Sequence, residues 1–296
     1  MPERKNAIIS AMAKRRRKVK PVRVILIVIV FIICLIGFFE AAGMLFRLLF
    51  QNGQTAAEQT PEVPAETVDP IYKHDYDWQY LRHNDGLYSY EDSKYTSRVG
   101  VDVSYLQGNI DWNKVKAAGI DFAIIRAGYR GYETGILHED SYFRANIENA
   151  VAAGLDVGVY FFSQMISPEE AEEEAEFVLD LVKDYPVISI AFDLEEADSE
   201  GRSNANSQDI NTKGAVSFCK KIKAAGYTPL VYGSASWMYT DIRMRDLQDM
   251  TQFWMAAYGW DVPKFPYVFT IWQYDCEGRV DGIPTKVDLN ILFVEK

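Results

Sequence analysis

The sequence has few residues of the types that carry nucleophilic or metal chemistry. Its 296 residues include three histidines and three cysteines, and their spacing does not match a zinc site. His74 and His83 precede the regularly patterned part of the chain, and His138 lies beside two acids without a nearby nucleophile motif. Neither a histidine-assisted hydrolase nor a metal or cofactor enzyme is therefore expected.

Cysteine is also too scarce for a disulfide framework. Cys34 lies in an apolar run, which leaves Cys219 and Cys276 for the rest of the chain. Two unpaired, partly buried thiols are expected, and a single bridge between them is the alternative.

Positive charge is concentrated in the first 23 residues. This segment holds nine Lys or Arg residues and one Glu, although the whole chain has a net charge of -11. The remainder is therefore strongly acidic and repels phosphate backbones, so nucleic acid is not an expected partner. Charge alone would not hold this part on an anionic wall polymer either.

An apolar run follows the basic segment. Residues 24–39 carry no charge, and after Glu40 the apolar character resumes as far as Phe46. Sixteen helical residues span roughly 24 Å, and the next few complete a bilayer core of about 30 Å. Because the basic cluster precedes the run, we expect a single-pass signal anchor in the cell membrane, in the type II orientation, with the later chain extracellular. A signal peptide cleaved after the small residues 41–43 is the alternative.

The composition divides the chain into five predicted parts. These are a basic cytoplasmic segment (1–23), a transmembrane anchor (24–46), a polar, Pro-bearing disordered linker (47–70), an irregular lead-in (71–98) and a barrel (99–296).

Strand-like and helix-like patterns alternate in the last part. The strand candidates are residues 100–104, 122–126, 157–163, 187–193, 228–232, 253–258, 268–272 and 287–292, and the helical candidates are 113–118, 141–153, 168–183 and 211–225. This alternation predicts an α/β fold, an irregular (β/α) TIM-like barrel with a mainly parallel sheet. No glycine-rich loop follows a strand, which disfavours nucleotide binding.

Acidic residues stand inside several of these apolar strands. Asp193 ends the fourth candidate and Glu195 lies two residues further on; alternate strand residues project from one face about 6.5–7 Å apart. Asp102 and Asp288 lie in the first and last candidates, which are neighbours in a closed barrel. Desolvation and mutual repulsion raise the pKa of at least one member of such a group. The pattern predicts a proton donor beside ionised carboxylates, as glycosidic bond cleavage requires.

A single acidic residue in such a position can also have a purely structural role. An isolated Asp at a strand end is more often a helix cap or a solvated terminus. The acidic run at residues 169–176 is predicted to be a solvated helix face.

Six motifs follow one another between Gly100 and Phe293. They are GVDVSYLQGNIDW (100–112), FAIIRAGYRGY (122–132), VGVYFFSQ (157–164), FDLEE (192–196), WQYDCEGRVDGI (272–283) and VDLN (287–290). Together they resemble glycoside hydrolase family 25, the Chalaropsis-type lysozymes. The resemblance implies an irregular α/β barrel that hydrolyses the β-1,4 bond between N-acetylmuramic acid and N-acetylglucosamine in the peptidoglycan glycan strand.

The resemblance also implies roles for the four acids. Glu195 is then the general acid, and Asp193 orients the 2-acetamido group of the substrate in a substrate-assisted, retaining route. Direct attack by Asp193 and a water-based inverting course are the alternatives. Asp102 and Asp288 would tune the field of the site and bind sugar hydroxyls. The expected substrate-binding residues are the aromatics Tyr160, Trp254, Trp272 and Tyr274 and the polar partners Arg126 and Gln273.

Two segments depart from the usual appearance of the family, residues 199–208 and 237–246. Two rival functions also remain, a non-catalytic scaffold that binds wall glycan and a glycosidase acting on another acetamido-sugar polymer such as chitin. All four acids are present, which disfavours the scaffold. The sequence does not identify any protein partner.

Overall fold

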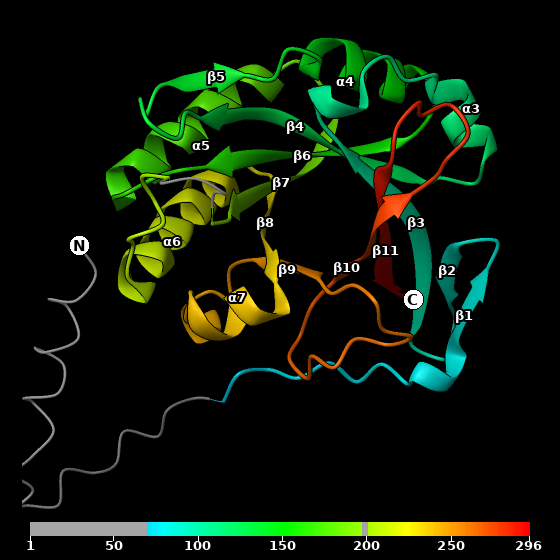
Figure 1. Ribbon diagram of the computed structural model, residues 1–296. Helices are drawn as coiled ribbons and strands as arrows, with labels where there is room; N and C mark the ends of the chain where they lie inside the picture. The colour runs from blue at the N-terminus through cyan, green and yellow to red at the C-terminus, as the bar shows by residue number, and fades with distance from the viewer. Residues whose placement is uncertain (1–69, 197–200) are drawn as a thin grey trace, which may run out of the picture. The chain divides into compact units, whose positions relative to one another are not determined.

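Nine strands form one sheet, and eight of them close it into a barrel (Figure 1). The computed structural model describes residues 70–196 and 201–296. The strand order is β3-β11-β10-β9-β8-β7-β6-β4-β5, and β3 also pairs with β4, so that β5 lies outside the closed ring. The strands of this sheet are β3 (Tyr95–Val103), β4 (Phe122–Arg130), β5 (Leu137–Glu139), β6 (Asp156–Ser163), β7 (Val187–Leu194), β8 (Thr228–Ser234), β9 (Gln252–Ala256), β10 (Ile271–Gly278) and β11 (Val287–Glu295).

The prediction of a TIM-like (β/α) barrel was wrong. In a TIM barrel every strand is parallel to its neighbours and is followed by a helix. Here β11 runs antiparallel to both β10 and β3, and no helix separates β9, β10 and β11 within the described residues 252–295. The strand and helix alternation that suggested the TIM type therefore holds only for the first part of the barrel. The helices are α3 (Trp112–Ala117), α4 (Phe143–Ala152), α5 (Pro168–Val182), α6 (Gln208–Ala224) and α7 (Ala235–Thr240), with 3-10 turns η1 (Trp78–Tyr80), η2 (Tyr105–Gln107) and η3 (Met244–Asp246).

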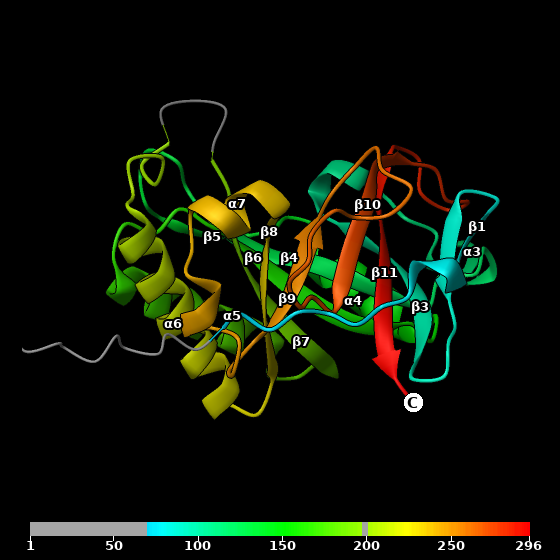
Figure 2. The ribbon, with the colours of Figure 1, turned by 90° about the horizontal axis from the view of Figure 1, so that it is seen from below.

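Helices and the chain before β3 cover different sides of the barrel (Figures 1 and 2). Helices α4, α5 and α6 pack on β4, β6, β7 and β8. The opposite side is covered by the lead-in, which contains the hairpin β1 (Leu81–Asn84) and β2 (Leu87–Tyr90). Tyr76 stacks on Phe293 with ring centroids 4.2 Å apart, and Tyr88 packs edge-on against Tyr274. The lead-in therefore takes the place of the helices that are missing after β9 and β10.

Side chains alternate between the barrel interior and its outer layer along each strand. A small apolar cluster fills the interior, and its members include Phe122, Ile124, Ala191, Leu230 and Ile271. The residues between them belong to a larger cluster outside the ring. This alternation directs the polar residues at the carboxyl ends of the same strands into the interior, above the apolar cluster.

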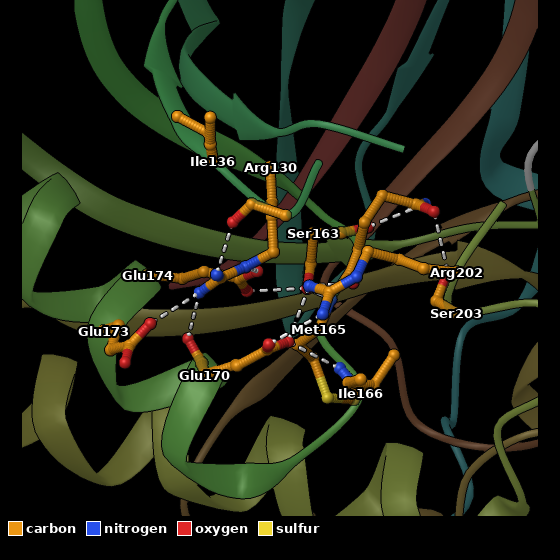
Figure 3. Close-up of polar contacts among 12 residues, drawn as sticks. Arg130, Ile136, Ser163, Met165, Ile166, Glu170, Glu173, Glu174, Arg202 and Ser203 are labelled. Carbon is orange, nitrogen blue, oxygen red and sulfur yellow. Dashed lines mark hydrogen bonds and ion pairs between the residues drawn. The ribbon is translucent and has the colours of Figure 1, made fainter. Parts of the chain in front are cut away.

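The acidic run at residues 169–176 is not uniformly solvated, contrary to expectation. Glu174 is fully buried and accepts hydrogen bonds from Arg130 Nε at 2.7 Å and the Ser163 hydroxyl at 2.6 Å (Figure 3). Burial raises the pKa of Glu174 to about 7, although both partners lower it. The prediction failed here because Glu174 shares the inward helix face with Ala171 and Val178.

Several predictions concern residues that the structure does not describe. Segments 1–23 and 24–46 lie outside the described residues, as do Cys34 and all of segment 47–70 except Pro70. Among the residues that are described, no helix is long and apolar enough to cross a membrane. Cys219 and Cys276 are both unpaired, as expected, but Cys276 is exposed and only Cys219 is buried.

Candidate active site

A cavity of about 280 Å³ opens at the end of the barrel where β3, β4, β6 and β7 finish. We call it the acidic cavity because four carboxyl side chains line it, those of Asp102, Asp193, Glu195 and Asp288. The structure thus places all four predicted acids at one site. Four of the six predicted substrate-binding residues also line it, namely Arg126, Tyr160, Trp254 and Gln273.

Strand β11 brings Asp288 to this end of the barrel. Asp288 pairs directly with Asp102 in the antiparallel register of β11 and β3. Because β11 runs opposite to β3, its second residue lies beside the carboxyl end of β3. Asp288 therefore reaches the cavity from the start of its strand, whereas the other acids reach it from strand ends.

Strand β7 supplies the other two acids. Its apolar side chains pack on both faces, and Asp193 is the last but one residue of the strand. Asp193 lies in register with Phe162 of β6 and Tyr232 of β8. Glu195 follows directly after the strand, two residues beyond Asp193, and so returns to the interior side.

A hydrogen-bond network fixes the Asp102 carboxylate. Its Oδ2 atom accepts from Gln273 Nε2 and from Asn290 Nδ2, each at 2.7 Å. The Trp254 indole N–H donates to Asn290 Oδ1 at 2.8 Å, and an indole can only donate. This bond fixes the orientation of the Asn290 amide, whose NH2 group must then face Asp102.

Gln273 is oriented in the same way. The Tyr232 hydroxyl donates to Gln273 Oε1 at 2.7 Å, and the Tyr258 hydroxyl donates to the same oxygen. The NH2 group of Gln273 is thereby directed at Asp102. Both amides act as fixed donors to one buried carboxylate.

Burial perturbs the ionisation of the whole group. It raises the pKa of Asp102 to about 6, although the hydrogen bonds from Asn290 and Gln273 lower it. Burial and the negative charge of Asp102 raise the pKa of Asp288 to about 8. Burial also raises the pKa of Glu195. The cavity therefore holds protonated and ionised carboxyl groups side by side near neutral pH.

Asp193 differs from Asp102 in its hydrogen bonding. Its Oδ1 atom is buried and has no hydrogen-bond partner among the residues that the structure describes. Burial, Glu195 and Asp102 raise its pKa well above the usual range, and Arg126 acts in the opposite direction. Arg126 is itself held by Asp140, to which its Nε donates at 2.8 Å, and by the ring of Tyr105. Asp193 thus presents an acceptor that the protein leaves unused.

The sequence profile of glycosyl hydrolases family 25 matches residues 101–283, which is more than half of the chain. The chain belongs to this family. The resemblance inferred from the six sequence motifs is therefore confirmed.

Known proteins similar to this chain agree with the assignment. Lysozyme M1 of Streptomyces globisporus is 31% identical over 199 residues, which cover 64% of this chain and 66% of that protein. The modular autolysin LytC of Streptococcus pneumoniae, solved with a synthetic peptidoglycan ligand, is 25% identical with a TM-score of 0.60, covering 72% of this chain and 52% of LytC. A lysozyme from Streptomyces coelicolor is 28% identical with a TM-score of 0.56, covering 67% and 92%. The chain thus spans only about half of LytC and slightly less than two thirds of Lysozyme M1.

In this family 25 barrel, two predicted substrate-binding residues do not reach the cavity. Trp272 and Tyr274 belong to the outer cluster, where Trp272 is fully buried and donates its indole N–H to Ala257 O at 2.9 Å. Both rings pack against Tyr88 of the lead-in. Strand alternation explains the result, because Ile271 and Gln273 of β10 point inward and the residues next to them point outward.

The sequence prediction missed three polar residues of the site. Tyr232 and Tyr258 hold Gln273, and Asn290 holds Asp102. A signal for Asn290 was present, because it stands two residues after Asp288 and so shares its face of β11. Tyr258 lies beyond the end of β9, where strand periodicity carries no information.

The described residues offer the site acid–base chemistry. Among them, no group of three or more His, Cys, Asp or Glu side chains is arranged to hold a metal ion. Three kinds of group line the one cavity. Asp102 is a buried carboxylate with fixed donors, Glu195 is a carboxyl group with a raised pKa, and Asp193 offers an unused acceptor. This combination can donate a proton and stabilise a developing positive charge.

The ionisation of Asp288 leads to a prediction about stability. Its pKa lies above that of an aspartate in an unfolded chain, so the folded protein binds this proton more tightly. Its favourable contribution is complete below about pH 4 and is lost as the pH rises toward 8. We expect Asp288→Asn to raise the free energy of unfolding at pH 8 by about 1–3 kcal/mol, and to change it little at pH 4.5.

Urea denaturation at the two pH values measures this difference. The exposed residue Asp281 provides the control, and Asp281→Asn should give no pH-dependent gain. An equal effect of Asp288→Asn at both pH values would contradict the assignment.

Proposed function

We propose that this chain is a peptidoglycan hydrolase that cleaves the β-1,4 bond between N-acetylmuramic acid and N-acetylglucosamine. The observation that carries the proposal is the convergence of Asp193, Glu195, Asp102 and Asp288 on one cavity of a family 25 barrel. The names of the related lysozymes and the peptidoglycan ligand of LytC support the choice of substrate.

Glu195 is the general acid of this proposal. Its side chain is half-buried, and burial raises its pKa, so it keeps a proton at a pH where exposed glutamates are ionised. It lies on the wall of the acidic cavity and also lines two adjoining pockets, so it borders the space on two sides. From this position it protonates the glycosidic oxygen as the bond to the anomeric carbon breaks.

Asp193 assists the substrate's own 2-acetamido group. Its unpaired Oδ1 accepts the acetamido N–H, which turns the carbonyl oxygen toward the anomeric carbon. That oxygen forms the new bond as the leaving sugar departs with the proton of Glu195. Water then attacks the anomeric carbon and breaks its bond to the acetamido oxygen while it gives a proton to the Glu195 carboxylate, so that the acid and the original configuration are both restored.

Asp102 and Asp288 support this step. The two amide donors keep Asp102 in one orientation, and its charge acts on the cavity where positive charge develops at the anomeric carbon. Asp288 carries a proton near neutral pH and can donate it to a sugar hydroxyl. Tyr160, half-buried on the cavity wall, provides the aromatic contact.

Replacing the proposed acid tests the mechanism. We expect Glu195→Gln to lower kcat/KM on peptidoglycan by about 100-fold to 10,000-fold, because proton donation to the leaving oxygen is lost. The assay counts new reducing ends and identifies the terminal sugar by mass spectrometry. Thermal unfolding should remain close to that of the wild type.

A conservative change at an exposed glutamate serves as the control. Glu172 lies on the solvated face of α5, and Glu172→Gln should keep wild-type activity. Full activity of Glu195→Gln would refute its role. Reducing ends on N-acetylglucosamine in place of muramic acid would refute the proposed bond, and an inactive wild type would favour a glycan-binding scaffold.

The assisting role of Asp193 predicts the stereochemistry of the product. Participation of the acetamido group requires two inversions, so the β configuration should be retained in the first product formed. Proton NMR of a soluble oligosaccharide digest, recorded before mutarotation, distinguishes the two anomers. An α product at the earliest times would instead indicate direct attack by water.

We also propose that residues 24–46 attach the enzyme to the cell membrane and that the barrel acts outside the cell. The apolar run and the basic residues before it support this location. Fractionation of cells producing the full chain should recover it with the membrane, and external protease should digest the barrel in intact protoplasts. Recovery of the full chain in the cytosol would contradict the proposal.

A further inference from the structure

Two segments of the chain have no part in the site described so far, residues 201–207 and helix α7. They overlap the two sequence stretches that departed from the family pattern, residues 199–208 and 237–246. Both lie beside Glu195, at the mouth of the barrel. Gln208, at the start of α6, donates to the carbonyl of Thr240 at the end of α7, which links the two segments directly.

The first segment is tied firmly to the barrel (Figure 3). Arg202 forms two parallel bonds to the Glu170 carboxylate, at 2.8 and 2.9 Å. The Ser203 hydroxyl donates to Oε1 of Gln164 at 2.9 Å, and Gln164 is itself fully buried and donates to the backbone carbonyl of Glu195. A bidentate ion pair and a buried amide hold the segment in one position, and the same amide contacts the backbone of Glu195.

The second segment places a tryptophan beside Glu195. The Ser234 side chain caps α7 by accepting from the backbone N–H of Trp237 at 3.1 Å. The Trp237 ring lies against Gly233, where a Cβ atom would be only 2.4 Å from the ring. The ring can therefore occupy this position only because residue 233 has no side chain.

Together the two segments line a pair of adjoining pockets that we call the Trp237 pocket. Their volumes are about 410 and 140 Å³, and both are bordered by Glu195, Glu196, Trp237 and Asp241. The larger also shares Tyr232 and Tyr258 with the acidic cavity, so the two spaces meet at Glu195. The smaller is bordered by Asn204, Asn206 and Asn211.

The chemistry of the Trp237 pocket suits an uncharged amide-bearing sugar. An aromatic ring and several side-chain amides are the groups that contact the apolar face and the acetamido and hydroxyl groups of such a ligand. Asn211 is 5% exposed, and its Oδ1 lacks a hydrogen-bond partner within the described residues. The pocket carries the carboxylates of Glu196 and Asp241 and, in the described part of the chain, no Lys or Arg, which disfavours an anionic ligand.

The position of Glu195 indicates which of the two sugars joined by the scissile bond lies in each space. The general acid protonates the oxygen that departs with the leaving sugar. Glu195 separates the acidic cavity from the Trp237 pocket and borders both, whereas Asp102, Asp193 and Asp288 border only the former. The sugar whose anomeric carbon reacts therefore lies in the acidic cavity, and the leaving sugar lies beyond Glu195.

We propose that the Trp237 pocket binds the leaving sugar, an uncharged N-acetylhexosamine without a lactyl or peptide carboxylate. This inference rests on the proposed function and adds to it the residues that select the leaving side. In peptidoglycan the sugar of this description is N-acetylglucosamine. Trp237 and its neighbours thus contribute to where the strand is cut, while the four acids perform the cut.

Two substrates with the same reacting disaccharide separate this role from the chemistry. One carries N-acetylglucosamine as the leaving group, and the other is the corresponding β-glycosyl fluoride, whose leaving group is too small to fill the pocket. We expect Trp237→Ala to lower kcat/KM for the oligosaccharide about tenfold or more and for the fluoride by less than about twofold. Gly233→Ala, which displaces the ring without altering a polar group, should act in the same direction.

Tyr239 provides a matched control on the same helix. Its ring contacts Phe265 and Tyr267 and borders neither pocket, so Tyr239→Ala should leave the ratio of the two rates unchanged. Equal losses on both substrates, or no loss, with Trp237→Ala in an active enzyme would overturn this inference alone. A wild-type enzyme that releases no sugar from the oligosaccharide would overturn the proposed function and this inference with it.

Discussion

The pairing of β11 between β10 and β3 is the constraint on which the rest of the site depends. It closes the ring, and its antiparallel direction brings the first residues of β11 to the same end as the last residues of β3 and β7. Eight residue pairs, from Asp288 with Asp102 to Glu295 with Tyr95, fix the register. A slip of one residue would turn Asp288 and Asn290 outward and remove both from the cavity.

Closure also forces like charges together, and the surrounding residues offset part of that cost. Asp102 receives two amide donors, and Trp254, Tyr232 and Tyr258 fix the orientation of those amides. Asp193 receives no such donor within the described residues. The network therefore stabilises the Asp102 carboxylate in part and leaves Asp193 open to the substrate, which divides the supporting role from the substrate-facing role within a single cavity.

The mouth of the barrel is built from segments that the strands do not determine. Residues 201–207 are held by Arg202 and Ser203, and α7 is held by its Ser234 cap and by the contact between Trp237 and Gly233. These contacts are made by side chains, unlike the backbone ladder bonds of the barrel. The chemistry and the binding of the leaving side can therefore vary independently on the same framework.

The sequence by itself determined much of the local structure and the identity of the acids. Short apolar, β-branched and aromatic runs predicted the strands that carry Asp102, Asp193 and Asp288, and the acids were recognisable because each interrupts such a run. The same patterns could not give strand direction, so the barrel type was predicted wrongly, and they could not separate inside from outside. Trp272 and Gln273 are adjacent in sequence, yet only Gln273 faces the cavity, because the orientation depends on which face of β10 turns inward when the ring closes.

Tertiary structure also determined the burial of Glu174. This residue lies on the inward face of its helix and pairs with Arg130, which is 44 residues away in the sequence. Short-range periodicity can be recognised in the sequence itself, whereas the closure of the barrel and the burial of particular side chains arise only when distant segments pair.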